Sequence, residues 1–216
     1  MVIRITAHLF SGAYLKHLII ILTILFSYAV TVDADLNLIG QGTSTHGTYN
    51  LIYDTDLDIT WYDYTHLVGG WDNQMDWASA LSVTFGTNTY TNWRLPMIEI
   101  DCSSPTGWGC TGGEIGHLYY TELGNVYTPT SDRGLNNRGD FNNLQNNRLY
   151  WSRLEHSNTI SAWMFNTGTG QQGATNKTGN LYAIAVMDGR AVAPEPVSST
   201  LFLIGGAALG LRRFRK

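Results

Sequence analysis

Two apolar segments, one at each end of the chain, most constrain how the 216 residues fold. Near the C-terminus, residues 197–211 carry no charge and are followed by a basic end. As a helix, this segment rises about 22 Å at ~1.5 Å per residue, which is less than the ~30 Å hydrocarbon thickness of a bilayer. Basic side chains lengthen its reach because they extend to the cytoplasmic membrane surface. The residues of this predicted membrane stop are Arg212, Arg213, Arg215 and Lys216.

The N-terminal segment has the pattern of a secretory signal peptide. Arg4 and Lys16 precede an apolar run over 18–30, which is too short for a comfortable membrane span. Small residues provide cleavage sites after Ala29 and after Ala34. We therefore predict a signal peptide over residues 1–34, with the Sec translocon and signal peptidase as partners. A retained N-terminal anchor is the alternative.

The C-terminal end resembles the PEP-CTERM sorting signal of Gram-negative bacteria, although its helix is shorter than is usual in that family. The matching motif, ahead of the apolar segment, is Pro194, Glu195 and Pro196. The resemblance implies recognition of residues 194–216 by an exosortase. It also implies at least transient anchoring in the cell membrane, followed by transfer to the cell surface or extracellular matrix. An ordinary C-terminal membrane anchor is the alternative.

Between these ends, residues 35–193 form one predicted extracellular domain with an acidic charge balance. The chain has 13 basic and 17 acidic residues, of which six and two lie in the two ends, so the domain keeps 7 and 15 and a formal net charge of −8. This balance weighs against nucleic acid and anionic polysaccharide as partners. A neutral exopolysaccharide, bound by aromatic rings and amides, is the more compatible ligand.

The only two cysteines, Cys102 and Cys110, enclose a short segment rich in turn-forming residues. In an exported protein this spacing predicts a disulfide. A zinc site is a poor alternative because no further Cys or His follows at ligand spacing.

Local patterns predict a mixture of strands and helices. A helix is expected from Asp72, as the N-cap, to Val83, and a second over 113–123 with Gly124 at its C-terminus. Residues 166–180 are predicted to form a long hairpin loop, and residues 92–96 are predicted to be extended. The predicted strands are 49–53, 59–62, 148–152, 161–165 and 181–186.

Several segments resemble, in order, the domain-of-unknown-function family 1566, also called the Lcl C-terminal domain. They are Leu51-Ile52-Tyr53-Asp54 with Thr60-Trp61, then Asn92-Trp93-Arg94-Leu95-Pro96, then residues 116–125, then Tyr150-Trp151-Ser152, then Ala162-Trp163-Met164-Phe165. The likeness covers nearly all of 48–189 and implies an α+β, C-type-lectin-like fold. The chain departs from the family at Arg153-Leu154 and at Met187-Asp188.

Acidic and histidine residues do not form a recognised catalytic or metal motif. Asp54, Asp56 and Asp58 alternate as in a calcium loop, but Ile59 stands where that loop needs glycine, so turn carboxylates bonded to the backbone are expected instead. His117 and Glu122 are five positions apart and are not expected to share a helix face. We expect His117 to pack near Tyr119 and Tyr120, and Glu122 to point outward or cap. No catalytic residue, metal or cofactor is predicted.

The tryptophans suggest both core and ligand-binding positions. Trp61 and Trp93 are expected in the core, with Arg94 paired to a carboxylate. Trp108, expected to be exposed in the cysteine loop, is the candidate for stacking on a sugar. The amides at Asn136-Asn137, Asn142-Asn143 and Asn146-Asn147 are candidate sugar contacts, or simply solvated loops.

Three functions are compatible with these features. The first is a non-enzymatic cell-surface or matrix protein associated with exopolysaccharide and biofilm. The second is a lectin-like adhesin that binds a glycan or a protein. The third is a secreted hydrolase, for which Glu114 and Glu122 are a conceivable carboxylate pair.

Overall fold

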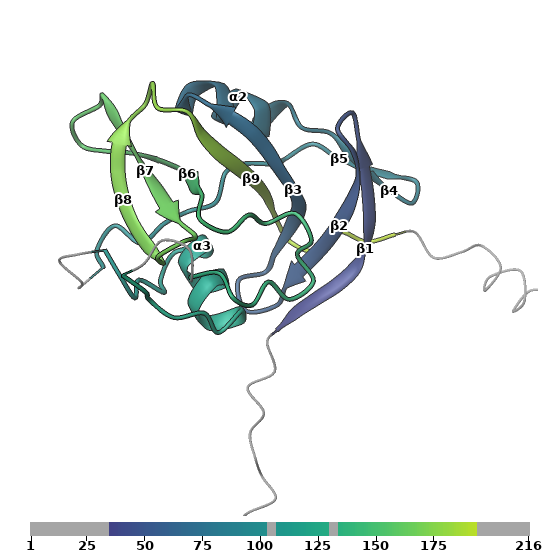
Figure 1. The fold of residues 1–216 in the computed structure, drawn as a ribbon. Helices are drawn as coiled ribbons and strands as arrows, with labels where there is room; N and C mark the ends of the chain where they lie inside the picture. Colours follow the sequence, from purple (N-terminus) through teal and green to yellow (C-terminus); the bar gives the residue numbers. More distant parts are fainter. Residues whose placement is uncertain (1–34, 103–106, 130–133, 194–216) are drawn as a thin grey trace, which may run out of the picture. The chain divides into compact units, whose positions relative to one another are not determined.

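A computed structural model describes residues 35–102, 107–129 and 134–193 (Figure 1). The predicted signal peptide over 1–34 and the sorting motif, membrane helix and basic end over 194–216 lie outside the described residues. Among the residues that are described, no helix is long and apolar enough to cross a membrane.

The described chain forms a mixed α+β domain with one nine-stranded sheet. The strand order is β5-β4-β1-β2-β3-β9-β6-β7-β8. The strands are β1 Leu36–Ser44, β2 Gly47–Asp54, β3 Ile59–Gly69, β4 Val83–Phe85, β5 Asn88–Tyr90, β6 Leu149–Glu155, β7 Ser161–Asn166, β8 Gln171–Asn176 and β9 Leu181–Asp188. The helical elements are α2 Trp71–Ala80, α3 Glu114–His117 and the π-helical turn η1 Leu118–Glu122. This confirms the α+β class predicted from the sequence.

Nearly all strand pairs are antiparallel, and the last strand lies at the middle of the sheet. β9 pairs antiparallel with β3 on one side and parallel with β6, at Tyr150 and Tyr182, on the other (Figure 1). β9 therefore joins the sheet formed by the first half of the chain to the hairpins formed by the second half.

The central strands are buried on both faces, because side chains alternate along a strand. On one face, Trp61 of β3 and Val186 of β9 belong to the core that includes α3 and η1. On the other face, their neighbours Tyr62 and Ala185 pack with Trp93. Trp61 and Trp93 are 0% and 3% exposed, which confirms their predicted core positions.

Arg94 links its own extended segment to β9 and α3 through hydrogen bonds and an ion pair. Its backbone N–H and carbonyl both bond to Val186 of β9, each at 2.9 Å. Its guanidinium makes a bidentate ion pair with Glu114 of α3, at 2.6 and 2.8 Å, and also bonds Asp188. The predicted pairing of Arg94 with a carboxylate is confirmed, and the hydrogen bonds with Glu114 raise the pKa of Arg94. Glu114, one carboxylate of the conceivable hydrolase pair, is therefore engaged in this ion pair.

The predicted strands at 49–53, 59–62, 148–152, 161–165 and 181–186 all appear, as β2, β3, β6, β7 and β9. Two expectations about other segments are wrong. The helix after residue 70 begins at Trp71 and ends at Ala80, with Gly70 rather than Asp72 at its N-cap; Asp72 is an acidic residue of the first turn. Within the expected loop 166–180, polar residues form β8, because their backbone groups pair along β7. Alternating apolar side chains are not needed at a sheet edge that is partly solvated.

The second predicted helix is interrupted in a way that the sequence pattern does not show. Residues Glu114–His117 form a single α-helical turn, which continues as a π-helical turn. In the π-helical turn, the Leu123 N–H donates to the Leu118 carbonyl at 2.9 Å. Gly124 ends the segment with a φ of 60°, as expected for a glycine that follows a helix.

Gly116 lets α3 lie close to the backbone of Cys110, at the end of the cysteine loop. A Cβ at this position would lie 2.1 Å from the carbonyl oxygen of Cys110, a backbone atom that cannot move aside easily. We expect Gly116→Ala to lower the free energy of unfolding by about 1–3 kcal/mol, measured by urea denaturation.

Gly173→Ala is the matched control for this substitution, because its Cβ would meet only the flexible end of Met164, at 3.2 Å. We expect it to change the free energy of unfolding by less than about 0.5 kcal/mol. Equal stabilities of the two variants would contradict the proposed role of Gly116.

Candidate functional site

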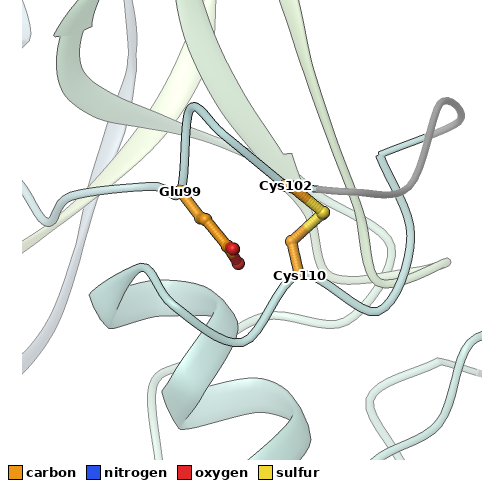
Figure 2. Close-up of side chains that lie close together, drawn as sticks. All are labelled: Glu99, Cys102 and Cys110. Atoms are coloured by element: carbon orange, nitrogen blue, oxygen red, sulfur yellow. A yellow bond between two sulfur atoms is a disulfide. The ribbon is translucent and has the colours of Figure 1, made fainter.

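The cysteine loop contains the predicted disulfide. Cys102 and Cys110 are bonded, with their Cα atoms 5.5 Å apart. Figure 2 shows the Glu99 side chain beside this disulfide, above the helical segment. The Glu99 carboxylate accepts the Gly112 N–H at 2.8 Å. Although Glu99 and the two sulfur atoms lie close enough to share a metal ion, both sulfurs are in the disulfide and neither is a thiolate ligand.

Trp108 is half-buried, so the expectation of an exposed ring is wrong. Its ring packs on that of Tyr127, with a centroid distance of 4.2 Å and a tilt of 33°. Tyr127 therefore covers part of the surface that a sugar would need. A ligand at Trp108 would contact only the part of its ring that Tyr127 leaves accessible.

A cluster of aromatic rings lies where the β1–β2 turn, β2, β3 and α2 meet. We call it the aromatic cluster; its members are His46, Tyr49, Tyr64, His66 and Trp77. His66 stacks on Trp77 with centroids 4.4 Å apart, and His46 stacks on Tyr64 at 4.9 Å. Tyr64 and His66 fall on the same face of β3 because they are two positions apart. No local sequence pattern predicts this cluster, because its members come from four separate elements.

Next to the aromatic cluster lies a cavity of about 220 Å³, which we call the tyrosine groove. Its walls combine aromatic rings, amides and one guanidinium group. The lining residues are Tyr49, Tyr64, Thr65, Leu67, Asn143, Gln145, Arg148 and Tyr182. The Arg148 guanidinium lies over the ring of Tyr182, 5.6 Å from its centroid. Such a mixture of flat apolar surfaces and directional polar groups is typical of small-molecule sites.

Buried Asp63 holds the loop that supplies the groove's amides. Its carboxylate accepts the backbone N–H of Asn142 at 2.8 Å and that of Asn143 at 3.0 Å. It also accepts the side-chain amide of Asn143 at 3.2 Å. Burial raises the pKa of Asp63, while the hydrogen bonds from this loop oppose the rise. Asp63 is therefore a positioning residue for the groove.

The asparagine pairs named from the sequence have different roles. Asn143 lines the groove, as a candidate sugar contact would. The side-chain oxygen of Asn146 accepts the N–H groups of Leu135 and Asn147, so it serves the loop itself. The side-chain amide of Asn137 bonds the Leu123 carbonyl at 2.9 Å. The amides of Asn137 and Asn146 therefore stabilise loops, while Asn143 lines the groove.

A second cluster brings together Asp54, His117 and Glu122, and we call it the carboxylate–histidine cluster. One ligand atom from each residue lies within 4.8 Å of the others. His117 Nε2 is 3.0 Å from Glu122 Oε1, and 3.7 Å from Oδ2 of Asp56 at the edge of the cluster. Burial raises the pKa of both the Asp54 and Glu122 carboxyl groups, and the charge of Asp54 raises that of Glu122 further.

This cluster corrects two expectations. Glu122 is buried rather than outward-facing, and its carboxylate bonds to His117. The two residues do share a helix face, because a π-turn closes i to i+5 hydrogen bonds and so aligns positions five apart. The expectation for Asp54 is confirmed, since its Oδ1 accepts the Leu57 N–H at 3.0 Å.

Comparison with protein-family models finds no match to this chain, and comparison with curated proteins finds none either.

The role of Asp63 can be tested by Asp63→Asn. An amide has one acceptor oxygen, and its NH₂ would face donors, so the loop at 142–143 loses acceptors. We expect the free energy of unfolding to fall by roughly 1–3 kcal/mol, and the amide hydrogens of Asn142 and Asn143 to exchange faster. Asp140→Asn, an exposed change in the same loop, is expected to do neither. Unchanged exchange at both amides in Asp63→Asn would contradict this role.

Proposed function

We propose that the chain is an exported, non-enzymatic protein of the cell surface or extracellular matrix whose domain binds a neutral glycan in the tyrosine groove. The observation that carries the binding part is the convergence of tyrosine rings, amides and Arg148 around one cavity. Aromatic rings stack on the apolar faces of sugars, while amides and guanidinium groups donate to hydroxyl oxygens.

Several features support a binding role rather than catalysis at this groove. The described lining residues include no carboxylate or histidine that could act as a general acid or base. The net charge of −8 over residues 35–193 disfavours anionic polymers and is compatible with a neutral one. The α+β sheet is compatible with a C-type-lectin-like domain of the family 1566 type, which the sequence resembles. We propose that the domain has this C-type-lectin-like fold and belongs to family 1566.

Export and sorting are inferred from the sequences of the two ends of the chain, residues 1–34 and 194–216. In this proposal, signal peptidase removes the segment over 1–34 after Sec translocation. An exosortase then recognises Pro194, Glu195 and Pro196, while the basic end holds the helix in the membrane. Transfer to the surface would place the groove in contact with exopolysaccharide.

A glycan array with the full chain tests the binding proposal. We expect neutral glycans to bind and Arg148→Ala to weaken binding about tenfold or more, because hydrogen bonds to charged groups contribute about 1.5–3 kcal/mol. Arg153→Ala, an exposed arginine on β6 outside the groove, is the matched control and should bind as the parent does.

Two other results of the array would be informative. Loss of binding in Trp108→Ala but not in Arg148→Ala would move the site to the cysteine loop. No signal above background on any glycan would remove the lectin function and leave a structural role in the matrix.

Sorting is tested by producing the full chain in a Gram-negative host with and without an exosortase. We expect a shortened chain only when the exosortase is present, detected by immunoblot. Glu195→Ala should prevent the shortening, whereas Val192→Ala, just before the motif, should not. Identical processing with and without the exosortase would favour an ordinary anchor.

A further inference from the structure

The carboxylate–histidine cluster lies outside the tyrosine groove and has a different chemistry. We propose that Asp54, His117 and Glu122 bind one divalent transition-metal ion, such as Zn²⁺, with Asp56 contributing from the solvent side. This proposal is independent of glycan binding.

The spacing of the donor atoms suits a single ion. Metal–ligand distances of about 2.0–2.2 Å separate neighbouring ligand atoms by roughly 3.0–3.5 Å. The distance from His117 Nε2 to Glu122 Oε1 is 3.0 Å, and that to Asp56 Oδ2 is 3.7 Å. The carboxylate oxygen of Asp54 lies within 4.8 Å of the other two ligand atoms. Small side-chain movements would therefore bring all three atoms within bonding distance of one ion.

Within the part of the chain that the structure describes, two buried carboxylate oxygens of this cluster have no hydrogen-bond partner. Asp54 is 0% exposed and the Glu122 side chain is 2% exposed. Asp54 Oδ2 and Glu122 Oε2 are each buried without a partner. An unsatisfied buried carboxylate oxygen is costly, and a cation is the ligand that satisfies two of them at once.

The indole N–H of Trp61 does not satisfy these oxygens. Among the described residues it, too, is buried without a hydrogen-bond partner. Glu122 Oε1 bonds to His117 Nε2, and Oε2 has no partner among the described residues.

The surrounding backbone positions the ligands in advance. Leu57 N–H binds Asp54 Oδ1 and so leaves Oδ2 available. The π-turn brings His117 and Glu122 to one face, and π-turns occur frequently at functional sites. His117 and Asp56 provide access, because their side chains are 15% and 49% exposed.

The donor set distinguishes among metal ions. Ca²⁺ and Mg²⁺ prefer shells made of oxygen atoms, whereas an imidazole nitrogen suits Zn²⁺, Fe²⁺, Ni²⁺ or Cu²⁺. Two carboxylates and a neutral imidazole carry a charge of about −2, which a dication balances. Binding displaces any proton from His117 Nε2, so that the nitrogen becomes a ligand rather than a donor to Glu122.

Calorimetric titration of the metal-free full chain, purified in detergent, with ZnCl₂ tests this proposal. We expect saturable binding of one Zn²⁺ per chain and a rise in the melting temperature. His117→Gln and Glu122→Gln should each weaken binding about tenfold or more and abolish the rise in melting temperature.

A matched pair on the exposed turn decides the matter if the buried variants fail to fold. Asp56→Asn removes a proposed ligand and should weaken Zn²⁺ binding severalfold. Asp58→Asn removes the same charge two positions away and should leave it unchanged; its φ of 49° is one that asparagine tolerates.

Three results would overturn the proposal. They are the absence of saturable binding to the wild-type chain, equal affinities of the Asp56→Asn and Asp58→Asn variants, and loss of binding in His66→Gln, which would assign the ion to the histidines of the aromatic cluster. Because glycan binding is measured separately with Arg148→Ala, failure of either proposal leaves the other intact.

Discussion

The pairing of β9 with β3 is the interaction on which the rest of the domain depends. Trp61 of β3 lies opposite Val186 of β9, and both are completely buried. Because β9 is the last strand, this pairing forms only when nearly the whole domain has been synthesised. Arg94 then adds a bridge to Val186 and carries Glu114, and with it α3, to the same strand.

Both candidate sites are built outward from this centre. The tyrosine groove uses Tyr64 from β3 and Tyr182 from β9, which the central pairing brings to one side. The carboxylate–histidine cluster joins Asp54, at the end of β2, to the α3–η1 segment that packs on the core around Trp61. A rigid sheet thus supports polar groups that come from loops and turns, where ligand-binding residues are commonly found.

Local sequence patterns predicted the elements whose periodicity reflects burial. β9 reads as an apolar run because it is buried on both faces, and the second half of β2 and the first half of β3 are apolar for the same reason. The pattern failed at β8, where Gln171–Asn176 is polar and its strand character comes from pairing with β7. It failed again at η1, since a 3.6-residue period cannot reveal an insertion that widens one helical turn.

The sequence by itself determined the disulfide and the core positions of Trp61 and Trp93, because each follows from composition or from neighbouring residues. Only the tertiary structure decided which polar residues meet. Asp54 and His117 are far apart in the chain, and so are Tyr64 and Arg148; no local propensity encodes their proximity. Their contacts arise from strand register and from the π-turn, which are set by packing of the whole domain.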